Sequence, residues 1–339
     1  MKSKCNMTSI GVIGAGSWGT SLANLLAKKG HPVSLWAYEY DLVERMQTTR
    51  INDLYLPGII LSDNLSFTAV VADVTRLDVL LLVPPSQVMR RVLASCVHTI
   101  HPEALIISAS KGIENDTLAP MSTVLEEILP PSFVLRTAFL SGPTFAREVA
   151  LEQPSAVVVA AQSAETANRV QEIFSTDYFR VYTNNDIIGT EIGGALKNII
   201  AVAAGICEGL GYGNNTRAAL ITRGLSEMKR IGQALGAKPE TFSGLAGMGD
   251  LVLTCTGDLS RNRTVGVEIG KGRKLNDILS HMNMVAEGVK TTLSAYQLAK
   301  KMNVEVPIIN QMYAVLYEEK DPRLAVNELM ARELKSEYL

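Results

Sequence analysis

The chain has 339 residues, of which 47% are hydrophobic and 19% are charged. This composition is typical of a folded protein, and the length suggests two domains because one domain usually contains about 100–200 residues. The 32 basic and 34 acidic side chains leave a formal net charge of −2. We therefore exclude nucleic acid as a general partner, since a nucleic-acid binder usually carries a net positive field.

The N-terminal segment has no continuous apolar run that would make a secretion signal, because Gly14 and Gly16 interrupt the hydrophobic residues that begin at Ile10. The most apolar run, 199–207, is far shorter than the about 20 residues that cross a bilayer. The four cysteines are scattered and form no C-x-x-C pair, which argues against a disulfide framework. We expect a soluble, cytoplasmic protein that does not span a membrane.

In the first half of the chain, apolar β-rich runs alternate with helical patterns, which is typical of a parallel sheet covered by helices. Leu22, Leu25 and Leu26 recur at helical spacing after the first such run. We predict strands at 9–13, 33–36, 79–83, 105–107, 139–140, 156–159 and 179–182.

After about Asp186 the β-branched runs give way to stretches rich in Ala, Leu, Gly and Met. The periodicity of this half is helical, and Pro307 and Pro322 stand near expected helix starts. We predict helices at 193–205, 218–235, 293–302, 308–318 and 324–334.

A G-x-G-x-x-G motif, formed by Gly14, Gly16 and Gly19, follows the first predicted strand and opens the first predicted helix. The first glycine permits a tight turn, the second lets the backbone approach a pyrophosphate, and the third lets helix and sheet pack closely. The free N–H groups of the helix then face the phosphates. We therefore predict a Rossmann-like, doubly wound α/β domain at 1–189 that binds a dinucleotide, followed by an all-α domain at 190–339 that binds substrate.

The preference for NAD or NADP stays open at this point. Glu39 lies 20 residues beyond Gly19, where a carboxylate accepts hydrogen bonds from a ribose diol and disfavours a 2′-phosphate. A solvated glutamate in a turn is the alternative. The neighbouring Tyr38 has a ring that could stack on adenine.

Lys197 is the single cation in an otherwise apolar and small-residue helix. No Asp or Glu lies one turn away, which is unusual for a surface lysine. Burial lowers the pKa of an ammonium group, and a proton donor or acceptor near neutral pH needs such a pKa. We predict that Lys197 supplies the proton when a nicotinamide delivers hydride to a ketone; a structural or surface lysine is the alternative.

Polar groups also gather in three loops. The glycine-rich segment 244–250 ends in Asp250. Residues 260–263 read Ser-Arg-Asn-Arg, a set of donors suited to a phosphate dianion; a solvated basic turn is an equal alternative from these residues alone. A third segment, 108–112, follows a predicted strand and carries Lys111 to the carboxyl edge of the sheet. His98 and His101 lack a third ligand, so we predict no metal site.

These motifs occur together in one order: G-A-G-S-W-G-T, S-K-G at 110–112, S-G-P-T-F-A at 141–146, G-G-A-L-K-N at 193–198, G-M-G-D-L-V-L-T-C-T at 247–256 and S-R-N-R at 260–263. In this combination the chain resembles the bacterial-type NAD(P)-dependent glycerol-3-phosphate dehydrogenases over nearly its whole length. The resemblance implies interconversion of dihydroxyacetone phosphate and sn-glycerol 3-phosphate with NAD or NADP. It also implies a homodimer and a supply of glycerol phosphate for phospholipid synthesis.

The resemblance assigns a role to individual residues. It makes Lys197 the acid and base, with the further catalytic positions Lys111, Asn198, Asp250 and Thr254. The cofactor-binding positions are Gly14, Gly16, Ser17, Trp18, Gly19, Tyr38, Lys111, Ala146, Arg261, Val285 and Glu287. The substrate-binding positions are Lys111, Gly142, Thr144, Lys197, Asp250, Ser260, Arg261 and Asn262, with Arg261 and Asn262 at the phosphate. One departure stands out: many relatives carry Arg or His at the position of Tyr38, which argues against a strong NADP preference.

Two other functions fit part of the pattern. A dehydrogenase of the same architecture that acts on a β-hydroxy acid or on ketopantoate would also need a catalytic lysine. A non-catalytic dinucleotide sensor would bind the cofactor without turnover. The complete set of Lys197, Asp250 and Arg261 favours the phosphate-binding dehydrogenase.

Overall fold

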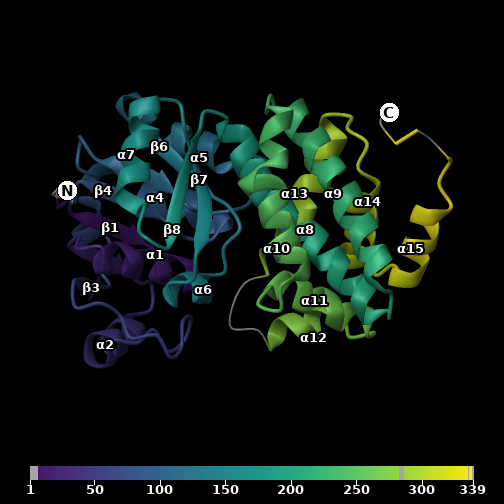
Figure 1. Cartoon of the computed structure of the whole chain (residues 1–339), viewed down its shortest axis with the longest axis horizontal. Coiled ribbons are helices and arrows are strands. Elements are labelled where there is room, and N and C mark those ends of the chain that lie inside the picture. The colour runs from purple at the N-terminus through teal and green to yellow at the C-terminus, as the bar shows by residue number, and fades with distance from the viewer. Residues whose placement is uncertain (1–6, 282–285, 335, 338–339) are drawn as a thin grey trace.

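The computed structural model describes residues 7–281, 286–334 and 336–337. A sheet with helices on both faces forms one part of the molecule, and a cluster of helices forms the other (Figure 1). The chain passes from the first part to the second between β8, which ends at Asn184, and α8, which begins at Ile187.

The sheet has eight strands in the order β3-β2-β1-β4-β5-β6-β7-β8. The first six follow the order 3-2-1-4-5-6 of doubly wound nucleotide-binding sheets, in which the chain reverses direction across the sheet between β1 and β4. Their bounds are β1 Ile10–Ile13, β2 Val33–Trp36, β3 Leu65–Thr68, β4 Val79–Leu82, β5 Leu105–Ser108, β6 Thr137–Ser141, β7 Ser155–Ala161 and β8 Phe179–Asn184.

The expectation of a parallel sheet needs a correction, because β7 pairs antiparallel with β6, and β8 runs parallel to β7. The connection between β6 and β7 contains only α6, Ala146–Ala150. A helix of five residues is about 7.5 Å long and a strand of five residues about 16.5 Å, so α6 is too short to return the chain to the other edge of the sheet. The next strand therefore begins at the edge where β6 ends.

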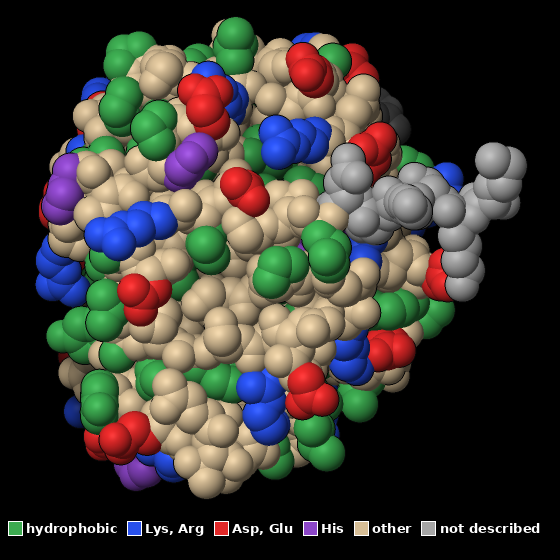
Figure 2. All heavy atoms as spheres, turned by 90° about the vertical axis from the view of Figure 1, so that its left-hand side faces the viewer, with side chains coloured by type: hydrophobic (Ala, Val, Ile, Leu, Met, Phe, Trp, Pro, Cys, Tyr) green, Lys and Arg blue, Asp and Glu red, His purple; other side chains and the backbone are tan. Residues whose placement is uncertain are grey.

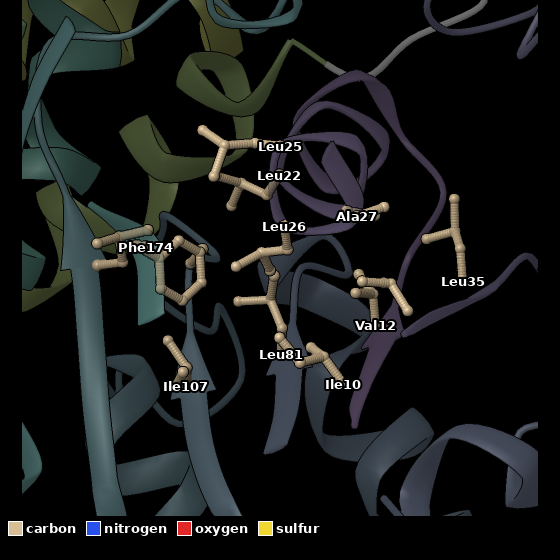
Figure 3. Close-up of a cluster of buried hydrophobic side chains, with 14 of the residues drawn as sticks. Ile10, Val12, Leu22, Leu25, Leu26, Ala27, Leu35, Leu81, Ile107 and Phe174 are labelled. Atoms are coloured by element: carbon tan, nitrogen blue, oxygen red, sulfur yellow. The ribbon is translucent and has the colours of Figure 1, made fainter. Parts of the chain in front are cut away.

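Two cores lie on the two faces of the sheet. Successive residues of each strand point to opposite faces, so Val12 belongs to one core and Ile13 to the other. Leu22, Leu25 and Leu26 of α1 pack over the strands on the first face (Figure 3). The helices of this part are α1 Ser17–Lys28, α2 Tyr40–Thr49, α3 Ala72–Thr75, α4 Ser86–Cys96, η1 Val97–Thr99, α5 Met121–Ile128, η2 Pro131–Arg136, α6 and α7 Ala164–Phe174.

The helical part surrounds α8, whose residues 192–207 are all buried. The five predicted helices are present, and α8 is longer than predicted at both ends. Three short helices between 250 and 280 escaped prediction. The bounds are α8 Ile187–Gly209, α9 Asn214–Ala234, η3 Pro239–Ser243, η4 Leu245–Gly249, α10 Asp250–Thr256, α11 Arg261–Gly270, α12 Leu275–Ser280, α13 Glu287–Lys301, α14 Pro307–Tyr317 and α15 Pro322–Met330.

Small residues let α8 and α11 approach at backbone distance. A Cβ added at Gly205 would lie 2.0 Å from the carbonyl oxygen of Arg263, and one at Gly266 would lie 2.0 Å from that of Val202. Any side chain at either glycine would therefore push the helices apart. This close contact fixes the position of the first turn of α11, which carries Arg261.

On the face shown in Figure 2, basic and acidic side chains are interspersed, in keeping with the small net charge. One described helix, α8, is long and apolar enough to cross a membrane by composition, but 89% of its apolar window is buried inside the protein. A buried core helix passes the same test, so α8 is weak evidence for a membrane span.

Candidate active site

The glycine-rich loop lies between β1 and α1, at the carboxyl edge of the sheet. Gly14 adopts a φ of 113°, which an L side chain would not tolerate, and its N–H donates to Trp36 O at 3.2 Å. A Cβ at Gly19 would lie 1.9 Å from Gly14 O, so this residue must be glycine for α1 to start here. Above Gly16, a Cβ would meet no atom within 4 Å. The loop therefore has the tight turn and the open approach that a pyrophosphate needs.

The first turn of α1 offers backbone donors to a ligand. Its N-cap is Gly16, which has no side chain to accept from the N–H groups of the turn. Within the described residues, the buried indole N–H of Trp18 has no hydrogen-bond acceptor. Together these groups fit an anionic dinucleotide.

A buried asparagine outside the motif supports this loop. Asn52 Nδ2 donates to Ala15 O and to Thr20 Oγ1, both at 2.8 Å, and the side chain is fully buried. Asn52 was not predicted as a site residue, because no motif includes it and its contact with Ala15 spans 37 positions.

Lys197 lies on the middle of α8, and two adjacent glycines bring its neighbours close. A Cβ at Gly193 would lie 2.5 Å from Ala246 O, and one at Gly194 would lie 2.7 Å from Ser141 Oγ. The η4 segment that leads to Asp250 therefore contacts α8 at Gly193, and the end of β6 contacts it at Gly194. These glycines explain why the G-G-A-L-K-N segment places Lys197 between the two parts of the molecule.

Lys197 and Lys111 share one carboxylate. Asp250 Oδ1 forms an ion pair with Lys197 Nζ, and Asp250 Oδ2 accepts from Lys111 Nζ at 2.6 Å. Thr254 Oγ1 accepts from Lys197 Nζ at 2.9 Å and donates to Asp250 O at 2.6 Å. Asp250 is fully buried, and Lys197 is only 6% exposed. The cluster therefore holds two lysine side chains against one carboxylate, and Asp250 and Lys197 are shielded from solvent.

Burial lowers the pKa of Lys197 from 10.5 to about 8. Asp250 opposes this shift by attraction, and Lys111 adds to it by repulsion. An amine with such a pKa exchanges a proton near neutral pH, which is the property predicted for Lys197 from its helix.

Lys111 also donates to Gly142 O at 3.2 Å. The motifs at 110–112 and 141–146 therefore meet beside Asp250 and Lys197. Gly142 adopts a φ of 140°, and a Cβ there would lie 2.9 Å from Val157 Cα. Thr144 Oγ1 donates to the same carbonyl at 3.3 Å. Gly142 and Thr144 thus lie beside Lys111.

Asn198 is turned toward a different neighbour. Its Oδ1 accepts from Asn262 Nδ2 at 3.0 Å, and Asn262 Oδ1 accepts from Gly288 N at 2.9 Å. This chain of bonds ties α8 to the first turns of α11 and α13. The side-chain bond of Asn198 thus runs to Asn262, whereas Lys197 Nζ donates to the hydroxyl of Thr254.

In the Ser-Arg-Asn-Arg segment, Arg261 contacts the glycine-rich loop, whereas Ser260 and Arg263 hold the start of α11 in place. Arg261 Nη2 donates to Ser17 Oγ at 2.9 Å, so Arg261 reaches from α11 to the glycine-rich loop. Burial lowers the pKa of Arg261, and Glu287 opposes this shift. Ser260 Oγ caps α11 by accepting from Arg263 N at 3.3 Å. Arg263 itself forms ion pairs with Glu208 and Asp258, which removes it from the site.

The remaining predicted cofactor positions lie on separate elements. Glu287 Oε2 accepts from Ser86 Oγ at 3.2 Å, and burial raises the pKa of Glu287 to about 7. Ala146 O accepts from Ser21 Oγ at 2.8 Å, which joins α6 to α1. Tyr38 is 83% exposed at the end of β2. Val285 lies outside the described residues.

Ser86 was also missed by the sequence analysis. It is buried at the start of α4, directly after the two prolines at 84–85 that follow the end of β4. A hydroxyl at the carboxyl end of β4, beside the point where the strand order reverses, is a usable signal for a ligand-binding position.

Comparison with known proteins identifies the family. Residues 9–167 match the N-terminus of NAD-dependent glycerol-3-phosphate dehydrogenase, and residues 186–327 match its C-terminus. The chain belongs to this family. The two matches cover both parts of the molecule, and they favour the glycerol-3-phosphate dehydrogenases over the β-hydroxy-acid and ketopantoate enzymes considered above.

Individual glycerol-3-phosphate dehydrogenases are similar over their full length. The one from Syntrophotalea carbinolica, described as glycerol-3-phosphate dehydrogenase [NAD(P)+], is 62% identical over 97% of this chain and 99% of its own. Its counterpart from Citrifermentans bemidjiense is 63% identical over 97% and 98%. The crystal structure of the glycerol-3-phosphate dehydrogenase from Coxiella burnetii superposes with a TM-score of 0.91 at 38% identity, covering 96% of this chain and 99% of that one.

Proposed function

We propose that this chain interconverts dihydroxyacetone phosphate and sn-glycerol 3-phosphate, using NAD or NADP as the oxidant or reductant. Its family supports the reaction, and one observation carries the chemistry: Lys197 Nζ is buried, has a pKa of about 8 and is held by Asp250 and Thr254. In this proposal residues 1–189 bind the dinucleotide, and residues 190–339 bind the substrate and supply Lys197.

Residues of the glycine-rich loop would hold the cofactor. The open space above Gly16, the helix start that no side chain caps, and the indole N–H of Trp18, which has no acceptor among the described residues, all fit it. Arg261, in contact with Ser17, would bring a positive charge to the same place. A bound nicotinamide supplies the hydride acceptor for oxidation of the alcohol and the hydride donor for reduction of the ketone.

Lys197 transfers the proton. In oxidation, neutral Lys197 Nζ takes the proton of the C2 hydroxyl as the C2–H bond breaks; in reduction, the ammonium returns a proton to the C2 oxygen. Asp250 favours the ammonium form by attraction, and Lys111 favours the neutral form by repulsion. Thr254, fixed by its bond to Asp250 O, orients Nζ. This balance lets one group act in both directions.

The first turn of α11 would hold the phosphate of the substrate. Arg261 brings a guanidinium and Asn262 a side-chain amide, and the N-terminus of α11 adds the partial positive charge of a helix start. Both Asn262 and Arg261 are already oriented, by Asn198 and Ser17 respectively. Lys111 and Gly142 lie beside the reacting end, next to Asp250.

The test is reduction of dihydroxyacetone phosphate by the full-length protein, followed as loss of NADH or NADPH absorbance, with ketopantoate as a control substrate. We expect turnover with the phosphate ester alone. Turnover with ketopantoate alone would overturn the substrate assignment, and cofactor binding without turnover on either would support the sensor.

The product would be used for phospholipid synthesis in the cytoplasm, and the protein would be a homodimer. Exposed apolar side chains on α15, Leu324 at 51% and Met330 at 81%, fit burial against a second copy. Light scattering of the purified protein tests the dimer: a mass of one chain would overturn it.

A further inference from the structure

Glu39 lies where the adenosine ribose of a bound dinucleotide would reach the protein. It follows β2 and is the N-cap of α2. The glycine-rich loop is directly beside it, because β1 and β2 are paired and Gly14 N donates to Trp36 O. In doubly wound folds, an acidic residue at this place hydrogen-bonds the ribose hydroxyls.

A tyrosine from a separate loop fixes this carboxylate. Tyr55 donates its hydroxyl proton to Glu39 Oε1 at 2.7 Å. Burial raises the pKa of Tyr55 to about 12, so the hydroxyl stays a donor over the physiological range. A carboxylate accepts about four hydrogen bonds, which leaves capacity for a ribose diol after the bond from Tyr55. Glu39 is thus positioned rather than freely rotating in solvent.

The same loop supports the pyrophosphate turn. Tyr55 N donates to Asn52 Oδ1 at 3.0 Å, and Asn52 Nδ2 donates to Ala15 O inside the glycine-rich motif. One turn of chain, 52–55, therefore sets the position of Glu39 relative to the phosphate loop.

The basic residues of the segment 37–78 pair or lie elsewhere. Between residues 37 and 78, all of them described, the basic residues are Arg45, Arg50 and Arg76. Arg45 Nε contacts both carboxylate oxygens of Asp53, at 3.1 and 3.0 Å. Arg50 donates to the carbonyls of Ser62 and Leu65. Arg76 follows α3 and precedes β4, so it lies toward the amino edge of the sheet.

We propose that Glu39, positioned by Tyr55, is the specificity-determining residue of the cofactor site, and that it selects NAD(H) over NADP(H). The ribose 2′-hydroxyl donates to Glu39, whereas a 2′-phosphate would place a dianion against the carboxylate with no cation from 37–78 to offset it. This inference rests on the proposed function, and it narrows the cofactor from NAD or NADP to NAD(H).

Binding measurements test the proposal without substrate. Calorimetric titration of the full-length protein would compare NADH with NADPH, and ADP-ribose with its 2′-phosphate. We expect the wild type to bind each unphosphorylated ligand at least about 10-fold more tightly, the size of one charge-assisted hydrogen bond. Glu39→Gln should lower this ratio about 10-fold or more. Tyr55→Phe should lower it less, because Glu39 remains but is no longer held.

Asp41→Asn is the matched control, since Asp41 is an exposed acid on the first turn of α2. It removes the same charge two residues away, and we expect the ratio to stay at the wild-type value. Equal or tighter binding of NADPH by the wild type would overturn the proposal, as would an unchanged ratio in Glu39→Gln. Failure to reduce dihydroxyacetone phosphate would instead remove the proposed function and leave the binding ratios standing.

Discussion

Asp250 accepts a hydrogen bond of 2.6 Å from Lys111 Nζ while its other carboxylate oxygen is paired with Lys197. Because Asp250 is fully buried, this one negative charge is the main support for two ammonium groups. The protonation state of Lys197 therefore depends on Asp250 as well as on burial.

Asp250→Asn should lower the pKa of Lys197 below its wild-type value of about 8, because attraction is removed and repulsion by Lys111 remains. Ketone reduction needs the ammonium form, so its activity should be lost at a lower pH than in the wild type. The pH dependence of kcat for dihydroxyacetone phosphate checks this. Asp258→Asn, which neutralises an acid that is 94% exposed, is the control. A midpoint that stays in place or rises would refute the role of Asp250.

The pH dependence of the wild type should differ between the two directions. Since Lys197 titrates near pH 8, the neutral amine needed for oxidation accumulates above that pH, and the ammonium needed for reduction is lost there. We expect kcat for sn-glycerol 3-phosphate to rise through about pH 8 and kcat for dihydroxyacetone phosphate to fall. Parallel pH profiles in both directions would be inconsistent with a lysine that acts as both base and acid.

Arg261→Ala should raise the KM for dihydroxyacetone phosphate about 10-fold or more, the usual scale of a charge-assisted bond to phosphate. Arg261→Lys should recover only part of the affinity, because an ammonium lacks the planar fork of donors. Steady-state kinetics at saturating NADH measure both. Arg273→Ala, which removes a surface partner of Glu268, serves as the comparison. An unchanged KM in Arg261→Ala would show that the phosphate binds elsewhere.

Glu227 affects stability rather than chemistry. Its buried carboxylate accepts from the N–H groups of Ile308 and Ile309 at 2.7 and 3.1 Å, which caps the first turn of α14. Glu227→Ala leaves these donors without an acceptor and should reduce the free energy of unfolding by about 1–3 kcal/mol. Urea denaturation measures the change in the free energy of unfolding. The control is Glu333→Ala, a substitution at an exposed position.

Glu227 also predicts a pH effect on stability. Burial raises its pKa from 4.5 to about 7, so the folded protein keeps a proton that the unfolded chain has released. Its contribution is therefore complete below pH 4.5 and is lost as the pH rises to about 7. The stability of the wild type relative to Glu227→Gln should fall across this interval. A difference that grows with pH would contradict the assigned direction.

Local patterns were sufficient to predict every described strand except β3, together with α1 and five helices of the second half. The strand at 33–36 was predicted with the observed bounds, and the glycine-rich turn follows β1 as its spacing required. Strand β3 was missed because Leu65–Thr68 is a four-residue edge strand with only alternating burial. The direction of β7 was also beyond a local pattern, because it depends on the length of α6 after the chain leaves β6.

The sequence predicts a set of candidate site residues but not their geometry. Lys197 stood out because it is the single cation in an apolar helix and has no acidic residue one turn away. Its pairing with Asp250 across 53 positions, and that of Lys111 with Asp250 across 139, follows from close packing at Gly193 and Gly194. Such contacts depend on how α8, η4 and β6 meet, which no single stretch of sequence encodes.

Lys197→Met tests the central claim most directly, because it keeps much of the side-chain volume and removes the proton-transfer group. The measurement is a single turnover with enzyme in excess over NADH and with saturating dihydroxyacetone phosphate. We predict that NADH oxidation by Lys197→Met slows about 10²–10⁴-fold, whereas the Kd for NADH stays at the wild-type value. The control Lys229→Met, at an exposed position, should react at the wild-type rate. NADH oxidation by Lys197→Met at the wild-type rate would contradict the assignment of Lys197 as the acid and base.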